Sequence, residues 1–186
     1  MILPVIGYGD PVLKKVGVEI NPEYPNLKKL IADMWDTMYN AGGVGLAAPQ
    51  VGKSIRLFIV DASPFDEDEE WLADFKQVFI NPIILEESGK VWDFSEGCLS
   101  IPGIREDVAR KPKITIQYQD EDFKIWEEEF EGVAARIIQH EYDHIEGKLF
   151  VEHLSPLKKR LLKNKLTDVA NGLMETKYKM KYYPQR

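Results

Sequence analysis

Two histidines, His140 and His144, lie four residues apart in a segment whose apolar residues recur at helical spacing. On a helix, such residues project from one face on successive turns, so both imidazoles can bind one metal ion. Glu141 lies one position further round and can reach a metal-bound water without ligating the metal. Positions 137, 138 and 145 are isoleucines, which predicts a mostly buried helix. Uncoordinated imidazoles would be costly there, so the pattern indicates a metal site.

The helix does not fix the third protein ligand that a catalytic tetrahedral site needs. Glu146, Glu152 and His153 follow it, and the chain's single cysteine, Cys98, lies upstream. A lone cysteine is more often a small buried residue than a ligand, but beside an H-E-x-x-H pattern both interpretations stand. The single cysteine also excludes an intramolecular disulfide, which argues against a secreted disulfide scaffold.

Hydrophobic periodicity predicts helices over residues 27–40, over a segment from Gly132 to about Gly147, and over about 155–175. Asn26 is expected to cap the first helix. Strands are expected at 55–60, at 78–85 as a broken or edge strand around Asn81-Pro82, and as a hairpin at 114–118 and 126–130. The predicted fold class is α+β: mainly antiparallel strands packed around a central metal-binding helix, with an N-terminal helix and a C-terminal amphipathic helix. The 186 residues fit one domain, 1–186.

Charge is distributed unevenly along the chain. The segment 154–186 contains nine basic and two acidic residues, a net charge of +7, and the remainder carries −14. A basic tail can contact nucleic acid or another polyanion, or can simply be a solvated helix. No apolar run is long enough to span a bilayer, and the first residues lack the features of a signal peptide, so we expect a cytoplasmic protein with no membrane partner.

Three separated segments resemble the signatures of the peptide deformylase family. They are residues 43–50 (GVGLAAPQ), 96–100 (EGCLS) and 139–144 (QHEYDH), in the order found in the family. Residues 9–13 (GDPVL) and 147–150 (GKLF) also resemble it, so the likeness extends from near residue 2 to at least 160. The acidic insert around 65–75 is less typical of the family and affects the expected shape of one loop on the substrate side.

The resemblance implies removal of the formyl group from the N-terminal formyl-methionine of newly synthesised proteins, releasing formate. It implies Cys98, His140 and His144 as ligands of one divalent metal ion, with water in the fourth position. The ion is expected to be Fe²⁺ physiologically, with Zn²⁺, Ni²⁺ or Co²⁺ able to occupy the site. Glu141 is implied as the general base and then the general acid.

The resemblance also implies roles for residues around the metal. The Gln50 side chain and the Leu99 backbone N–H are expected to stabilise the oxyanion, and the Gly45 backbone to bind the substrate main chain. Val44, Leu99 and Ile137 are candidates for the methionine pocket, and Arg105 for the cleft mouth. Further expectations concern an ion pair between Glu96 and Arg110, support of the ligand helix by Asp143, and a surface position for His153.

The expected partners are N-formyl-methionyl nascent peptides, with no DNA. In some bacterial deformylases a basic C-terminal helix docks on the ribosome, so we expect ribosomal RNA contacts from residues of the tail helix: Lys158, Lys159, Arg160, Lys163 and Lys165. Two other functions are open. A zinc endopeptidase of the H-E-x-x-H type would not need Cys98. A non-enzymatic RNA-binding module would need neither Glu141 nor Gln50.

Overall fold

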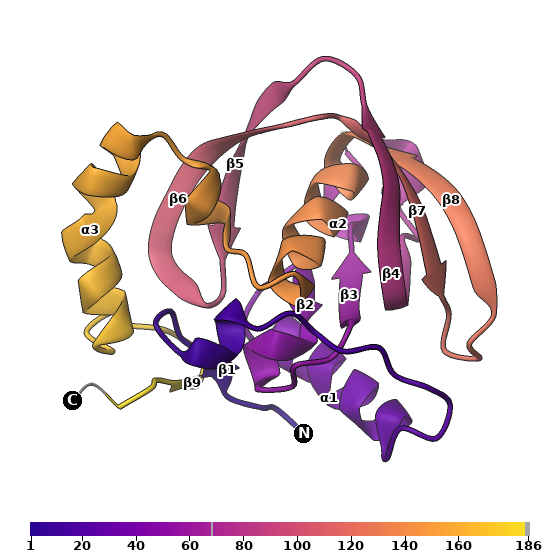
Figure 1. Cartoon of the computed structure of the whole chain (residues 1–186), viewed down its shortest axis with the longest axis horizontal. Coiled ribbons are helices and arrows are strands. Elements are labelled where there is room, and N and C mark those ends of the chain that lie inside the picture. Colours follow the sequence, from indigo (N-terminus) through magenta and orange to yellow (C-terminus); the bar gives the residue numbers. More distant parts are fainter. Residues whose placement is uncertain (68, 185–186) are drawn as a thin grey trace.

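The computed structural model describes residues 1–67 and 69–184; within them lie three α-helices and nine strands in three sheets (Figure 1). The helices are α1 (Leu27–Asn40), α2 (Gly132–Ile145) and α3 (Pro156–Ala170). The strands are β1 (Val5–Ile6), β2 (Gly45–Ala47), β3 (Leu57–Asp61), β4 (Lys76–Ser88), β5 (Trp92–Cys98), β6 (Ile101–Arg110), β7 (Lys113–Gln119), β8 (Ile125–Glu131) and β9 (Met180–Lys181). A mixed fold with mainly antiparallel strands was predicted, and it is confirmed.

The largest sheet has five antiparallel strands in the order β2-β3-β4-β7-β8. The predicted hairpin at 114–118 and 126–130 is confirmed as β7 and β8. The segment 78–85 was predicted to be a broken or edge strand. The edge alternative is wrong, because β4 pairs with β3 on one side and with β7 on the other, whereas the break is confirmed by irregular pairing with β7. A shift in register between Ile80 and Ile83 places Pro82 outside the regular ladder. Asn81 adopts a φ of 48° and exchanges side-chain hydrogen bonds with the backbone of Ile20.

Helix α2 lies between this sheet and the β5–β6 hairpin (Figure 1). Its apolar residues Val133, Ala134, Ile137 and Ile138 join one core cluster with the aromatic residues of the sheet. Because most of the remaining helix surface is covered as well, most of its polar side chains are also buried. The exposed fractions of His140, Glu141 and His144 are 9%, 4% and 1%.

The two other helices differ in detail from their prediction. Helix α1 has the predicted bounds, but Asn26 does not cap it: this residue has a left-handed backbone, and its side chain makes no capping hydrogen bond. Helix α3 is capped by Ser155 and ends at Ala170, five residues before the predicted end at 175. Its buried face consists of Leu162, Leu166 and Val169, so the body of the protein covers only a narrow stripe of it.

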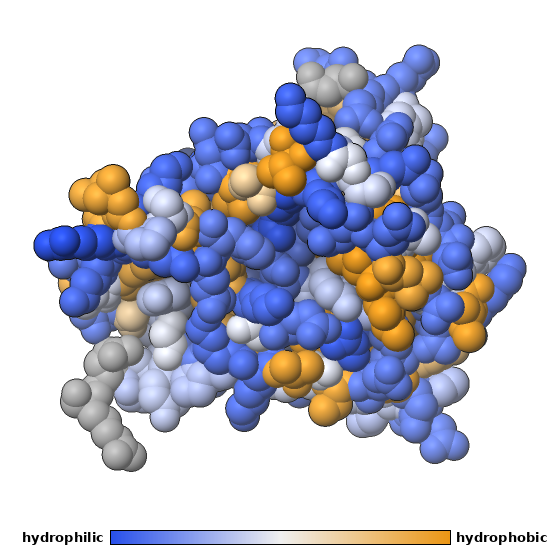
Figure 2. All heavy atoms as spheres, turned by 45° about the horizontal axis from the view of Figure 1, so that its top comes forward, coloured by the Kyte–Doolittle hydropathy of each residue, from blue (hydrophilic) through white to orange (hydrophobic). Residues whose placement is uncertain are grey.

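The chain returns to the body of the protein after α3. Strand β9 pairs in parallel with β1, so two segments from opposite ends of the sequence lie side by side (Figure 1). The ring of Tyr182 lies where side chains on Gly7 or Gly172 would otherwise be. No helix among the described residues is long and apolar enough to cross a membrane. One face of the molecule is mostly hydrophilic and carries only separate hydrophobic patches (Figure 2).

Candidate metal centre

Cys98, His140 and His144 converge on one point. Their ligand atoms all lie within 4.8 Å of one another, and the Sγ of Cys98 is 3.4 Å from the Nε2 of His144. The histidines come from successive turns of α2. Cys98 comes from the end of β5, where the pairing of Cys98 with Ile101 leaves only Leu99 and Ser100 to form the turn. This tight turn carries the sulfur to the helix.

The geometry fits a tetrahedral cation. Bonds of about 2.3 Å to sulfur and about 2.0 Å to nitrogen at a tetrahedral angle place the two ligand atoms about 3.5 Å apart, close to the observed separation. Three other residues were open as the third ligand, and each has another partner. Glu146 pairs with Arg56 at 2.7 Å, Glu152 with Lys14 at 2.8 Å, and His153 with Asp143 at 2.7 Å.

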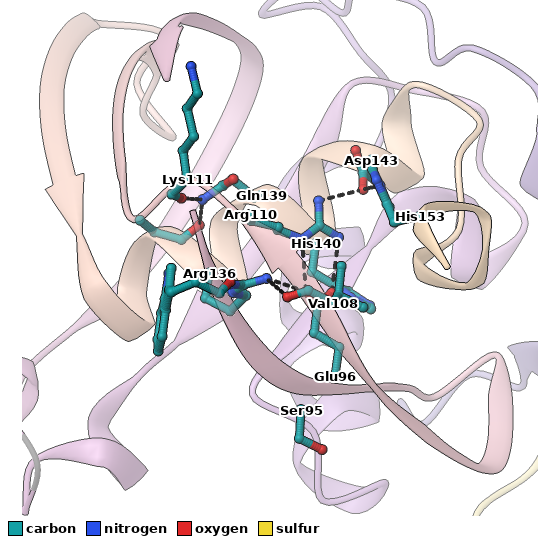
Figure 3. Close-up of polar contacts among 12 residues, drawn as sticks. Ser95, Glu96, Val108, Arg110, Lys111, Arg136, Gln139, His140, Asp143 and His153 are labelled. Carbon is teal, nitrogen blue, oxygen red and sulfur yellow. Dashed lines mark hydrogen bonds and ion pairs between the residues drawn. The ribbon is translucent and has the colours of Figure 1, made fainter. Parts of the chain in front are cut away.

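Glu96 organises the charges beside the ligand helix (Figure 3). The expected pair with Arg110 is present: the guanidinium donates to both carboxylate oxygens, at 2.8 and 3.0 Å. Arg136 donates to Glu96 at 2.9 Å, and the Nδ1 of His140 lies 2.9 Å from it. Burial alone would raise the pKa of Glu96, but hydrogen bonds from His140 and Arg110 lower it far below its usual range. An ionised Glu96 therefore holds the His140 ring with Nε2 free for a metal.

The network continues to Asp143. Arg110 donates to this carboxylate at 2.8 Å, and the Nε2 of His153 lies 2.7 Å from the same oxygen (Figure 3). Burial raises the pKa of Asp143, but His153 and Arg110 lower it below its usual value. Asp143 thus ties the ligand helix to β6, and His153, expected only as a surface residue, is part of the same network.

The carboxylate of Glu141 faces the centre beside β2. A side chain on Gly45 would collide with the Oε1 of Glu141, so the glycine makes room for it. The Oε2 of Glu141 is buried without a hydrogen-bond partner among the described residues. Burial raises the pKa of Glu141 to about 7, although the charge on His140 opposes the rise. A carboxyl group with a pKa near neutrality is suited to accept and return a proton.

Burial and neighbouring charges also act on the two histidines. Burial lowers the pKa of His140, but hydrogen bonds with Cys98 and Glu96 raise it well above 6.5. Burial and the charge of His140 hold the pKa of His144 well below 6.5. The site thus surrounds one imidazole with anionic groups and keeps the other neutral, an electrostatic setting that favours a bound cation.

Gln50 and Leu99 both lie beside the cysteine and line the same cavity. The Oε1 of Gln50 accepts a hydrogen bond from the backbone of Ala47 at 2.9 Å. This bond turns the amide so that its Nε2 lies 3.5 Å from the Sγ of Cys98 and 3.2 Å from the Oγ of Ser100. The side-chain amide and the turn that contains Leu99 therefore line the same corner of the centre.

A cavity of about 600 Å³ opens onto the metal centre. The four residues that we expected at the substrate are all in its wall: Val44, Gly45, Arg105 and Ile137. The Arg105 side chain also donates to the carbonyl of Ser95 at 2.8 Å. The sequence patterns missed Arg136, because an arginine in an amphipathic helix is usually solvated. They also missed Phe65 and Tyr178, which line the cavity from loops without periodicity.

The polypeptide deformylase family model matches residues 2–160. The chain belongs to the peptide deformylase family. The peptide deformylase of Flavobacterium johnsoniae is 57% identical over 98% of this chain and 96% of its own length, and that of Christiangramia forsetii is 58% identical over the same shares. A solved deformylase structure from Legionella pneumophila superposes with a TM-score of 0.80 at 39% identity, covering 93% of this chain and 98% of that one.

As a peptide deformylase, the chain is a metal-dependent hydrolase that removes the N-terminal formyl group from newly synthesised peptides. The endopeptidase alternative is not favoured, because the relatives that match almost the whole chain are deformylases.

Proposed function

We propose that Cys98, His140 and His144 hold one divalent cation and that α2 is the central metal-binding helix of the fold. The convergence of these three ligand atoms beside the unpaired oxygen of Glu141 is the observation that carries this proposal. Fe²⁺ is proposed as the physiological ion, and a thiolate with two imidazoles also suits Zn²⁺, Ni²⁺ or Co²⁺. When bound, such a cation polarises the formyl group and acidifies a water molecule.

Glu141 is proposed as the residue that moves the proton. Its Oε2 is free of protein donors, so it can accept a proton from the water that attacks the formyl carbon. The same carboxyl then delivers that proton to the departing α-amine. The C–N bond breaks, and formate and a free amino terminus result.

The oxyanion of the tetrahedral intermediate needs donors that are already in place. The Nε2 of Gln50 and the backbone N–H of Leu99 are proposed for this role. Support comes from the fixed orientation of the Gln50 amide, whose oxygen is already occupied by Ala47. Such donors act without reorganisation during the reaction.

The substrate main chain is proposed to bind along β2. This strand is at one end of the five-stranded sheet, and within the described part of the chain Gly45 pairs only with Val60 of β3. An extended peptide can pair with the opposite edge. Val44, Leu99 and Ile137 are proposed to contact the methionine side chain, and Arg105 to lie at the cleft mouth; all four line the cavity.

The basic residues of α3 are proposed to hold the enzyme near its substrate. The basic residues of α3 point into solvent except Lys158, which is partly covered and pairs with Glu106 at 3.0 Å. Contact between this helix and ribosomal RNA would put the cleft close to emerging chains, and cytoplasmic localisation is proposed on the same ground. We treat residues 1–186 as one catalytic domain; positions 68, 185 and 186 lie outside the described residues.

Anaerobic purification with metal analysis, followed by a formate-release assay on formyl-methionyl peptides, tests the proposed site. Cys98→Ala is expected to lose the metal and formate release together, whereas an endopeptidase centre would tolerate the change. Glu141→Ala is expected to retain the metal and to lose kcat by about 100-fold or more. Loss of metal from the Glu141 variant would contradict its assignment as the base.

A further inference from the structure

Three segments that are distant in the sequence hold the turn formed by Leu99 and Ser100. The backbone N–H of Tyr8 donates to the carbonyl of Ser100 at 2.9 Å, and the Nε2 of Gln50 lies 3.2 Å from the Oγ of Ser100. The third contact comes from beyond α3: the hydroxyl of Tyr178 donates to the carbonyl of Leu99 at 2.8 Å. In a two-residue turn this carbonyl has no place in the strand ladder, so the tyrosine supplies its hydrogen bond.

The segment that bears Tyr178 is part of the cleft wall. Residues 175–178 line the same cavity as Cys98 and Glu141. The segment is fixed at both ends, because Met174 packs against Gly103 of β6 and β9 pairs with β1. It lies outside the match to the family model, which ends at residue 160. The signatures that define the family therefore do not include it.

We propose that Tyr178 is a positioning residue for deformylation, which aligns the Leu99 backbone N–H with the oxyanion. This inference rests on the role proposed for that N–H. The carbonyl and the N–H of Leu99 belong to adjacent peptide planes that share one α-carbon. The φ and ψ rotations of Leu99 join these two planes. The hydroxyl of Tyr178 anchors the carbonyl plane, and the pairing of Cys98 with Ile101 anchors the strand on the other side of Leu99. With both sides held, the N–H of Leu99 has less freedom to turn away from the oxyanion.

Tyr178→Phe tests the proposal because it keeps the ring and removes only the hydroxyl. We expect kcat to fall about fivefold, the usual effect of one neutral hydrogen bond. KM and metal content are expected to stay at wild-type values, since the ring packing and the three metal ligands are unchanged. Tm is expected to fall by only a few degrees, because a single hydrogen bond is lost. The fall is expected to be equal for formyl-methionine alone and for formyl-Met-Ala-Ser, because the oxyanion is common to both.

Tyr182→Phe is the matched control. Tyr182 lies in the same tail, and its buried hydroxyl has no hydrogen-bond partner among the described residues, so its removal should leave kcat unchanged. The proposal is overturned if Tyr178→Phe has wild-type kcat, if both variants lose kcat equally, or if metal is lost together with kcat. A change confined to the KM of the tripeptide also overturns the proposal, because Tyr178 would then contact the substrate and would not align the Leu99 N–H. Loss of activity in Glu141→Ala with normal Tyr178→Phe would reject the tail's role alone, whereas an active Glu141→Ala would reject the proposed mechanism.

Discussion

The carboxylate of Glu141 occupies the space that a side chain on Gly45 would fill. The glycine belongs to β2 and the glutamate to α2, so one close contact sets the distance between the proposed base and the proposed substrate-binding strand. A larger residue at position 45 would therefore displace the carboxylate.

Gly45→Ala is therefore expected to reduce kcat about tenfold or more, because the added methyl group displaces Glu141 from the reacting water. Metal content should not change, since none of the three proposed ligands is touched. Formate-release kinetics and metal analysis provide the measurement. Gly89→Ala, in the β4–β5 turn, is the comparison. The φ of Gly89 is +91°, and an added methyl group would meet Pro112, which lies between β6 and β7. That variant should lose stability but keep kcat, and equal kcat losses in the two variants would count against the contact.

Glu96→Gln should weaken metal binding about 10- to 100-fold, the range for residues that orient a metal-ligating histidine. The neutral amide cannot balance Arg110 and Arg136 or hold the Nδ1 proton of His140 as strongly as the carboxylate does. Competition with a chelator measures the affinity. Glu106→Gln, which changes a surface pair with Lys158, should bind metal normally, and equal affinity in all three proteins would reject the role given to Glu96.

The stability contribution of Asp61 is expected to depend on pH. Burial raises the pKa of this carboxyl, but hydrogen bonds from Ser63 and Tyr39 lower it below 3.8. A lowered folded-state pKa stabilises the protein above about pH 4, and the effect is lost as the pH falls through the folded-state value. Asp61→Asn should therefore cost about 1–2 kcal/mol of unfolding free energy at pH 7 and less at pH 3.

Denaturant unfolding across this pH range measures the difference. Asp168→Asn on the exposed face of α3 serves as the control and should show little loss at any pH. A difference between wild type and Asp61→Asn that is as large at pH 3 as at pH 7 would show that the carboxylate charge is not responsible.

The ribosome hypothesis is best tested by charge changes. Truncation at Ser155 would also remove Leu162, Leu166 and Val169, which pack in the core, and the cleft segment around Tyr178. A variant with glutamate at four exposed positions of α3 should lose cosedimentation with ribosomes, most clearly at low salt. The positions are Lys159, Arg160, Lys163 and Lys165.

A second variant with the same change in net charge controls for overall repulsion. It carries glutamate at lysines outside α3: Lys28, Lys53, Lys90 and Lys111. If both variants sediment as the wild type does, or lose binding equally, α3 is not the contact. Formate release from a free peptide should stay normal in both, because none of these positions lines the cavity.

The sequence predicts best the elements whose pattern is local. The bounds of α1, the start of α2 and the β7–β8 hairpin follow from apolar spacing and from glycines at turns. The position of β4 could not be predicted, because an Asn-Pro pair usually marks an edge and only the pairing with β7 shows how a bulge accommodates it. Leu157 and Leu161 fit the apolar pattern of α3, yet they are 67% and 72% exposed. The core covers only one side of this helix.

In the candidate site, too, local patterns were predictable and long-range contacts were not. The proposed ligands and the proposed base lie within short motifs, whereas the residues that orient them come from separate elements. Arg136 has the spacing of a solvated residue and is nevertheless 1% exposed, because Glu96 and the carbonyls of Val108 and Trp92 accept its hydrogen bonds. No local sequence pattern predicts the contact between Tyr178 and Leu99, because this contact forms only when the segment after α3 folds back onto the body of the protein.

The pairing of β1 with β9 has a consequence for biosynthesis. Val5 and Ile6 leave the ribosome early, but the strand they pair with is translated only after every other strand and helix of the fold. Such a long-range parallel pairing forms late and slowly. Strand β1 therefore has no β9 to pair with while the other elements are being made. The wall of the cleft formed by residues 175–178 is completed after the rest of the fold.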